Sequence, residues 1–93
     1  MSQLLTEAEI QELANSLSGW IVKGNKLLSI REFKDFVAAI EFVNKLVEPA
    51  ELAAHHPDLE ISYNKVWVTL TTHDAGGLTQ QDFDLAMVIS QIA

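Results

Sequence analysis

Residues 59–73, LEISYNKVWVTLTTH, carry the clearest secondary-structure signal in the chain. Apolar and polar residues alternate on both sides of Asn64-Lys65, and a period of two residues is typical of strands that are buried on one face. The segment therefore predicts two antiparallel strands joined by a tight turn near Asn64-Lys65. The second of these strands places three apolar residues on one face, namely Val66, Val68 and Leu70.

A second hairpin is predicted upstream, in residues 19–33, GWIVKGNKLLSIREF. Gly24-Asn25 is a suitable turn dipeptide between its two strands. The pairs expected to share a face are Trp20 and Val22 on the first strand, and Leu28 and Ile30 on the second.

Helices are predicted before, between and after the hairpins. The first begins near Thr6, which has capping-box spacing to Glu9, and stops at Gly19. In the second, apolar residues recur at steps of three and four, and Pro49 is expected to end the helix. The apolar set of this second helix is Phe33, Phe36, Val37, Ile40, Val43 and Val47.

The last helix is expected to start at Thr79, which can cap it. Its predicted inward-facing residues are Phe83, Ala86, and Met87 or Ile89. Among all these apolar residues, Phe33, Phe36 and Met87 are interpreted as core, and Trp20 and Trp67 as packing or interface residues.

The order of the elements is thus α-β-β-α-β-β-α. Because hairpins pair their strands antiparallel, we expect an α+β fold with a four-stranded antiparallel sheet that carries its helices on one face. At 93 residues, the whole chain (1–93) is interpreted as a single domain. The core of so small a domain is thin, which favours assembly into a homo-oligomer.

Composition excludes several classes of function. The net charge is −7, from six Lys and Arg against 13 Asp and Glu, so binding to nucleic acid or to an anionic membrane is not expected. Without any cysteine, the chain has neither disulfides nor a thiol nucleophile. No apolar run reaches the ~20 residues that span a bilayer, and the N-terminus lacks a basic signal-peptide region. The expected location is the cytoplasm.

Three histidines mark a candidate site: His55, His56 and His73. The loop with the first two leads into the third strand, and His73 closes the fourth. In an antiparallel hairpin the start of one strand lies beside the end of the next, so all three side chains should meet at one end of the sheet. Two carboxylates accompany them, since Glu51 lies four residues before His55 and Asp82 lies in the first turn of the last helix.

These residues also have simpler interpretations. Asp82 lies where an acidic residue stabilises a helix N-terminus in any case. In the simpler interpretation, Pro57 does no more than stiffen the loop. Glu51 can be a solvated carboxylate. Three histidines can also hold zinc, but adjacent histidines point apart and the chain has no H-E-x-x-H or H-x-H pattern, so metal binding is the less favoured alternative.

Acid–base chemistry suits the three histidines better. A free imidazole has a pKa of about 6.5, so a group of imidazoles can supply both an acid and a base at neutral pH. No nucleophile elbow surrounds any serine. The sequence therefore predicts a site for proton transfer.

A larger pattern contains these residues. Glu51 is followed after three residues by His-His-Pro, five residues separate Pro57 from Tyr63, nine separate Tyr63 from His73, and eight separate His73 from Asp82. This spacing resembles the signature of the pterin-4a-carbinolamine dehydratases, also described as dimerisation cofactors of a homeodomain transcription factor. The segments GW at 19–20 and FKDF at 33–36 are similar too, so the resemblance extends from about Leu5 to the C-terminus.

The resemblance implies an α+β fold and one reaction, the dehydration of 4a-hydroxytetrahydrobiopterin to quinonoid dihydropterin. This reaction supports the recycling of tetrahydrobiopterin for aromatic amino acid hydroxylases, which become possible pathway partners. The family uses no metal and no organic cofactor. Its members are homodimers or homotetramers built through edge strands and helices.

The resemblance also implies roles for single residues. His55 and His73 become the groups for proton transfer, and His56 places the pterin ring. Glu51 is expected to orient the first histidine, and Asp82 to contribute to the substrate site. Among the remaining site positions, Thr71 and Thr72 are expected to offer backbone groups to the pterin, and Pro57 to shape the wall.

One position departs from the pattern, because Trp67 stands where some members have a histidine. It lies outside the signature, so we expect it to affect assembly rather than catalysis. A competing hypothesis is a binding module, in which the same pocket holds a pterin, or the same helices hold a partner protein, without catalysis.

Overall fold

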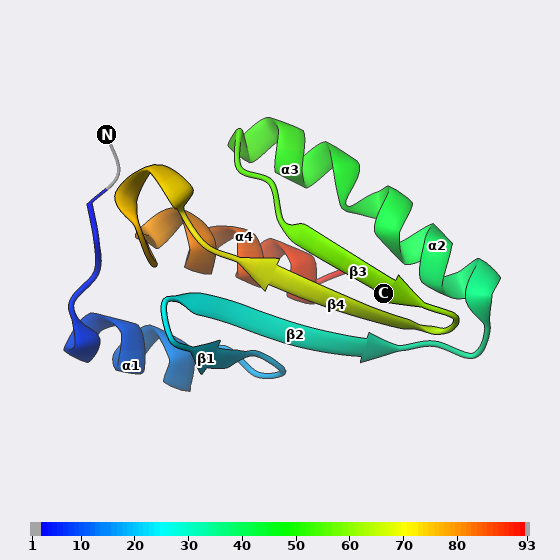
Figure 1. The fold of residues 1–93 in the computed structure, drawn as a ribbon, viewed down its shortest axis with the longest axis horizontal. Coiled ribbons are helices and arrows are strands. Elements are labelled where there is room, and N and C mark those ends of the chain that lie inside the picture. Colours follow the sequence, from blue (N-terminus) through cyan, green and yellow to red (C-terminus); the bar gives the residue numbers. More distant parts are fainter. Residues whose placement is uncertain (1–2, 93) are drawn as a thin grey trace.

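The computed structural model describes residues 3–92 (Figure 1). Its helices and strands follow one another in the predicted order, with the middle helical segment divided in two. They are α1 (Glu7–Asn15), β1 (Ile21–Lys23), β2 (Lys26–Glu32), α2 (Phe36–Lys45), α3 (Val47–Ala53), β3 (Asp58–Ser62), β4 (Lys65–Leu70), the 3₁₀ turn η1 (His73–Ala75) and α4 (Gln80–Ser90). The predicted α+β class is confirmed.

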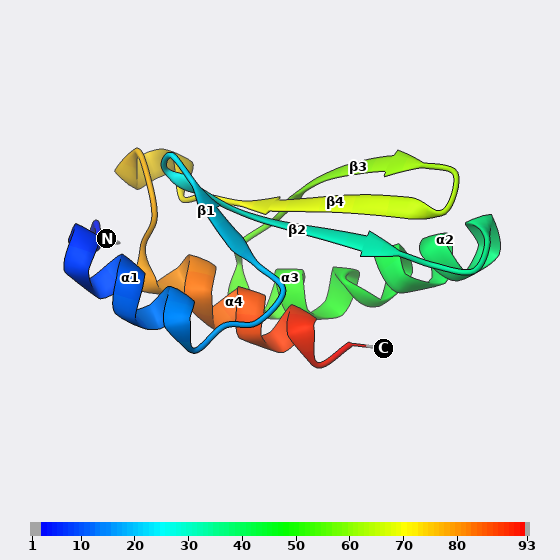
Figure 2. The same ribbon diagram turned by 90° about the horizontal axis from the view of Figure 1, so that it is seen from below.

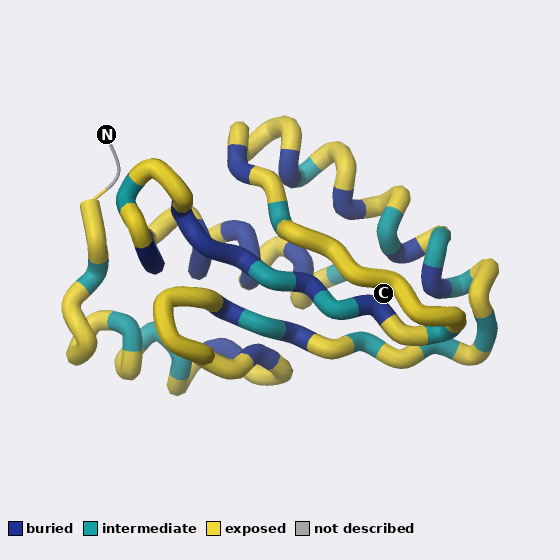
Figure 3. The backbone as a smooth tube through the Cα atoms, in the orientation of Figure 1, coloured by how far each residue is buried: buried dark blue, intermediate teal, exposed yellow. Residues whose placement is uncertain are grey.

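The four strands form one antiparallel sheet in the order β1-β2-β4-β3. Figure 2 shows the sheet as one layer and the α-helices as a second layer beneath it. Strand β4 lies between β2 and β3, and its side chains Val66, Val68 and Leu70 are fully buried against the helices. Strand β3, by contrast, is exposed along its whole length (Figure 3). Among residues 3–92, no α-helix covers the other face of the sheet (Figure 2).

Both hairpin turns are present, one at Gly24-Asn25 as predicted and one at Tyr63-Asn64, a residue earlier than the dipeptide near which it was predicted. Gly24 adopts a positive φ of 61° in the β1–β2 turn, and Tyr63 adopts a φ of 53° in the β3–β4 turn. Glycine takes such angles without strain, whereas Tyr63 does so at some cost. The first helix is capped as predicted, since the Thr6 hydroxyl accepts from the Glu9 N–H and the Glu9 carboxylate accepts from the Thr6 N–H.

The middle helix differs from its prediction. It breaks at Leu46, and Pro49 does not end a helix but lies in the first turn of α3. A proline fits there because the first N–H groups of a helix have no partner within it. The side chain of Leu46 is buried at the break.

The predicted inward face of this helix was wrong in part. Phe36, Val37 and Val47 are between 50% and 63% exposed, and the sheet is covered instead by Ala39 and Phe42. The segment carries apolar residues on more than one side, so periodicity alone could not select the buried face. Phe33 is partly buried against the core.

The last helix buries Phe83, Ala86 and Ile89 as predicted, but Met87 is 55% exposed and is not a core residue. Trp20 is buried and its indole N–H donates to the Ser90 hydroxyl, whereas Val22 is 40% exposed on the edge strand β1. In residues 3–92, no helix combines the length and the apolar character that crossing a bilayer requires.

Candidate active site

The site is a cavity of about 930 Å³ at one end of the sheet. It forms where the loop after α3, the loop after β4 and the N-terminal segment meet. All three histidines line this cavity, so the convergence predicted from the hairpin topology is confirmed. The lining residues are Gln3, Leu4, Ala54, His55, His56, Thr71, Thr72, His73, Asp74, Ala75 and Gln81. Its volume lies in the range of roughly 300–1,000 Å³ that is typical of small-molecule sites.

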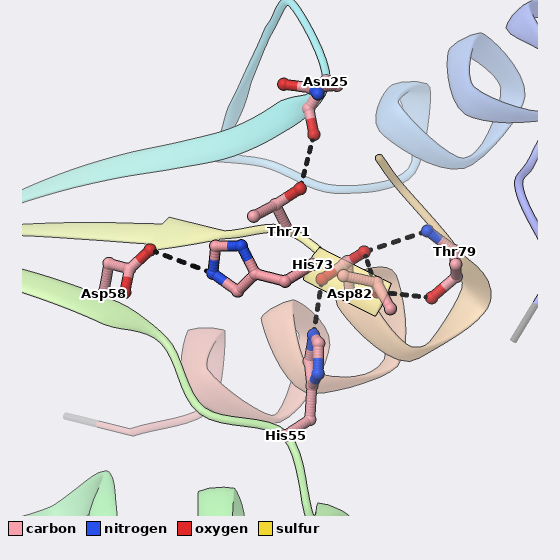
Figure 4. Close-up of polar contacts among 8 residues, drawn as sticks. Asn25, His55, Asp58, Thr71, His73, Thr79 and Asp82 are labelled. Atoms are coloured by element: carbon pink, nitrogen blue, oxygen red, sulfur yellow. Dashed lines mark hydrogen bonds and ion pairs between the residues drawn. The ribbon is translucent and has the colours of Figure 1, made fainter. Parts of the chain in front are cut away.

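His55 is the buried histidine of the three. Its side chain is 10% exposed, and its Nε2 lies 2.6 Å from Oδ1 of Asp82, whose side chain is fully buried. The two residues approach from different elements, His55 from the loop after α3 and Asp82 from the first turn of α4 (Figure 4). Such a short contact between an imidazole and a carboxylate is a strong, charge-assisted hydrogen bond.

Asp82 is held by a network of its own. Its Oδ2 accepts from the Thr72 hydroxyl at 2.8 Å and from the Thr79 N–H at 2.9 Å. The Thr72 and Thr79 hydroxyl oxygens are also 2.8 Å apart. A hydroxyl has one proton, and that of Thr72 is used by Asp82, so the Thr79 hydroxyl must donate to Thr72. Thr79, the N-cap residue of α4, thus completes a buried series of hydrogen bonds that runs through Thr72 and Asp82 to His55.

This network also selects the tautomer of His55. A carboxylate oxygen only accepts, so Nε2 must carry the proton and donate to Asp82. Every buried side-chain nitrogen or oxygen within residues 3–92 has a hydrogen-bond partner. Nδ1 of His55 forms no hydrogen bond with these residues, so it is not one of the buried atoms. Nδ1 must therefore be accessible, on a residue that lines the cavity. The arrangement presents a ring nitrogen to a ligand while a buried carboxylate holds the opposite side of the ring.

The backbone before His55 explains its inward position. Ala54 adopts the left-handed conformation, with φ 52° and ψ 38°, at the C-terminal end of α3. The His55 N–H then donates to the Ala50 carbonyl and the Ala54 N–H to the Glu51 carbonyl, which is a Schellman motif. A non-glycine residue in this conformation costs roughly 1–2 kcal/mol, so the turn that orients His55 is strained.

Glu51 pairs with the second histidine, not with the first. Its Oε2 lies 2.5 Å from Nε2 of His56, and the two side chains are 68% and 62% exposed. The expectation that Glu51 orients His55 was therefore wrong. Because of the left-handed turn at Ala54, the His55 side chain contacts α4, whereas the His56 side chain contacts Glu51 in the last turn of α3.

His73 is the most exposed of the three histidines that line the cavity. It begins η1, within a loop closed by hydrogen bonds between the backbones of Thr72 and Gly77. Its Nε2 lies 3.8 Å from Oδ2 of Asp58, at the start of β3, and the two side chains are 76% and 65% exposed (Figure 4).

The two threonines are bonded to the loop through different groups, and the expectation that the Thr71 backbone meets the pterin stays a prediction. The Thr72 N–H donates to the Gly77 carbonyl, and the Thr72 carbonyl accepts from Ala75, Gly76 and Gly77, so its backbone is occupied by the loop. The side chain of Thr71 donates to the Asn25 carbonyl at 2.8 Å, and Asn25 in turn donates to the Gly76 carbonyl. The β1–β2 turn therefore braces the loop that carries His73.

Pro57 and Asp82 are placed differently from the other predicted residues. Pro57 lines a neighbouring apolar groove between α2, α3 and β3, together with His56 and Glu51, and not the histidine cavity. Asp82 is fully buried behind His55, so it cannot contact a ligand in this structure. Its place in the site is that of a partner for His55 and not of a substrate ligand.

Sequence reasoning missed two N-terminal residues that line the cavity and three residues that support its lining residues from outside. The N-terminal segment contributes Gln3 and Leu4, held in place by a hydrogen bond from the Leu5 N–H to the Leu78 carbonyl. The capping position of Thr79 was a signal for its helix but not for its link to Thr72. For Asn25 and Asp58, nothing in the spacing pointed to the site.

The chemistry available at the cavity is proton transfer. Within residues 3–92, no three or more side chains of the metal-binding types are grouped so that they could hold an ion. Each histidine has instead a carboxylate within 3.8 Å or less. Fold and site together define an α+β protein with a histidine-lined cavity of a size that suits a small ligand.

Comparison with known proteins identifies the group to which this protein belongs. Residues 3–92 match the family described as pterin 4 alpha carbinolamine dehydratase, and the chain belongs to this family. It is therefore an enzyme of the hydro-lyase class.

Similar proteins match over nearly their full length. A protein of Trichormus variabilis whose name includes pterin-4-alpha-carbinolamine dehydratase is 72% identical over 92 residues, which are 99% of each chain. One of Cyanothece sp. with the same name is 64% identical, over 100% of this chain and 96% of the other. A crystal structure of a transcriptional coactivator/pterin dehydratase from Brucella melitensis is similar with a TM-score of 0.90 and 38% identity, covering 96% of this chain and 97% of the other.

Proposed function

We propose that the protein dehydrates 4a-hydroxytetrahydrobiopterin to quinonoid dihydropterin by histidine acid–base catalysis. The observation that carries the proposal is the His55–Asp82 pair: an imidazole with one accessible nitrogen, held by a buried carboxylate, in a cavity shared with two more histidines. The family to which the chain belongs and the names of its relatives support this substrate class.

The reaction needs an acid and a base and no redox partner. The substrate carries a hydroxyl on C4a, next to a nitrogen, N5, that carries a hydrogen. An acid protonates the hydroxyl, the C4a–O bond breaks with assistance from the N5 lone pair, and water leaves. A base then takes the proton from N5, which leaves the quinonoid product. One proton is given and one is taken, so the enzyme returns to its starting charge.

The environments of the histidines favour a division of roles. When Nδ1 of His55 accepts a proton, the ring becomes an imidazolium whose charge is stabilised by the buried Asp82 carboxylate at 2.6 Å. His55 is therefore the base in this proposal. His73, an exposed residue that lines the same cavity, is the acid that protonates the hydroxyl, and His56 helps to place the ring.

The proposal also includes the pathway, the cofactor requirement, the assembly and the location. The product has to be reduced elsewhere to regenerate tetrahydrobiopterin, and the substrate arises from aromatic amino acid hydroxylation. No cofactor is required, because the elimination involves neither electron transfer nor group transfer. Assembly as a homodimer or homotetramer and a cytoplasmic location remain predictions from the sequence.

The test uses freshly generated 4a-hydroxytetrahydrobiopterin, whose spontaneous dehydration in buffer gives the baseline. We expect the wild type to accelerate this decay, and His55→Ala and His73→Ala each to lower kcat on the order of 10²–10⁴-fold. Circular dichroism should show that both variants remain folded. A wild type that binds pterin in equilibrium dialysis without accelerating its decay would show a binding module and reject the proposal.

A further inference from the structure

We propose that Asp58 is a positioning residue for His73 in the dehydration reaction, an inference that rests on the proposed function. The three histidines of the cavity are each paired with a carboxylate, His55 with Asp82 and His56 with Glu51. The third pair, between His73 and Asp58, joins η1 to the start of β3.

The register of the sheet places Asp58 near His73. Asp58 is the first residue of β3, and its cross-strand partner is Thr69, near the end of β4. The chain leaves β4 at Leu70 and reaches His73 three residues later. The pairing of the two strands therefore brings the Asp58 carboxylate to 3.8 Å from the His73 ring, which points toward it (Figure 4).

The backbone of His73 is already restrained, but its side chain is not. The hydrogen bonds between Thr72 and Gly77 and the brace from Asn25 define the loop around His73. The imidazole itself is 76% exposed, and within residues 3–92 it has no other ion pair than that with Asp58. Asp58 is thus the one charged partner, among the described residues, that favours a particular orientation of the ring.

The expected size of the effect follows from the exposure of the pair. An exposed ion pair is weak and is screened by salt, so it favours one orientation of the ring by a factor of about two to five. A ring that is in the productive orientation less often transfers a proton less often. We therefore expect kcat to change while KM, which depends on ligand binding, stays within twofold.

The chain offers a matched control. Glu60 lies two residues further along β3, on the same face of the sheet, and within the part of the chain that the structure describes it forms no ion pair with a histidine. Glu60→Gln removes the same charge as Asp58→Asn from the same strand. Both side chains are exposed, so neither substitution threatens folding.

The experiment compares Asp58→Asn, Asp58→Glu and Glu60→Gln with the wild type. We expect Asp58→Asn to lower kcat about two- to fivefold at low salt with KM unchanged, Asp58→Glu to restore most of the activity, and Glu60→Gln to match the wild type. At high ionic strength the difference between wild type and Asp58→Asn should shrink, because the pair is screened. Equal kcat for Asp58→Asn and wild type, an equal loss in Glu60→Gln, or no recovery in Asp58→Glu would each overturn the proposal.

A structural measurement separates this proposal from the proposed function. Three-bond scalar couplings about χ1 of His73, measured by NMR, report how often the ring occupies one rotamer. We expect one dominant rotamer in the wild type and averaging in Asp58→Asn, whether or not the pterin reaction is catalysed. An unchanged rotamer distribution overturns the positioning role, whereas an inactive wild type with a changed distribution overturns only the function.

Discussion

Asp82 Oδ1 lies 2.6 Å from His55 Nε2, although the two residues are 27 positions apart in the chain. The carboxylate is fully buried and receives two further hydrogen bonds, from Thr72 and Thr79. A buried charge is stable in a protein only when it is paired and hydrogen-bonded. This pair is therefore the link between the stability of the fold and the chemistry of the cavity.

The first prediction concerns this link. Asp82→Ala leaves the buried His55 ring without its partner, and we expect the free energy of unfolding to fall by about 3–5 kcal/mol. Asp82→Asn preserves the shape but can present an N–H to the ring and so disturb its tautomer, and we expect kcat to fall by at least about 10²-fold. Urea denaturation and the dehydration assay measure the two effects.

Asp84→Asn is the control for both variants. Asp84 lies two residues further along α4, is exposed, and accepts from the Gln80 side chain at 2.9 Å. Its replacement should change stability by less than about 0.5 kcal/mol. If Asp82→Asn kept the activity of this control, the role of Asp82 in orienting His55 would be refuted.

The second prediction tests the buried hydroxyl chain. Thr72→Val keeps the shape of the side chain but removes the donor to Asp82 and the acceptor for Thr79. Unpaired buried polar groups cost about 1–3 kcal/mol, so we expect a loss of stability of this size. Thr69→Val on β4, a half-buried position, provides the comparison in urea denaturation. Equal stability of the two variants would contradict the network.

The third prediction follows from the partner of Glu51. Because Glu51 contacts the exposed His56 and not His55, Glu51→Gln should affect stability by less than about 1 kcal/mol. Its effect on kcat should be much smaller than that of Asp82→Asn, since the His55 pair stays intact. Steady-state kinetics of the two variants, measured side by side, decide this. A loss in Glu51→Gln as large as in Asp82→Asn would restore the original assignment of Glu51 to the first histidine.

The fourth prediction concerns the strained turn before His55. Ala54→Gly removes the side chain that disfavours the left-handed conformation, and we expect stability to rise by up to about 1 kcal/mol. For a domain of this size that corresponds to an increase in Tm of roughly 4–8 °C. Ala53→Gly, at the last helical residue of α3, should instead lower Tm, since glycine is a poor helix former. Thermal unfolding followed by circular dichroism compares the two, and a lower Tm for Ala54→Gly would contradict the strain.

Local patterns were enough to predict the sheet. The alternation around Asn64-Lys65 defined β3 and β4, and the burial of Val66, Val68 and Leu70 followed from it. Antiparallel pairing then brought His73 to the end of the sheet where His55 and His56 lie. These features depend on neighbours in the chain and on one rule of strand pairing, which is why they can be derived without coordinates.

The partners of the histidines depended on tertiary structure. The resemblance to the family suggested Glu51 as the partner of His55, but the left-handed turn at Ala54 places His56, not His55, beside Glu51. Asp82 lies behind His55 only because α4 packs under the sheet (Figure 2). The same holds for Phe36 and Met87, whose exposure depends on how each helix is rotated about its axis. Short-range sequence signals describe one element at a time, whereas side-chain pairing and burial are decided where several elements meet.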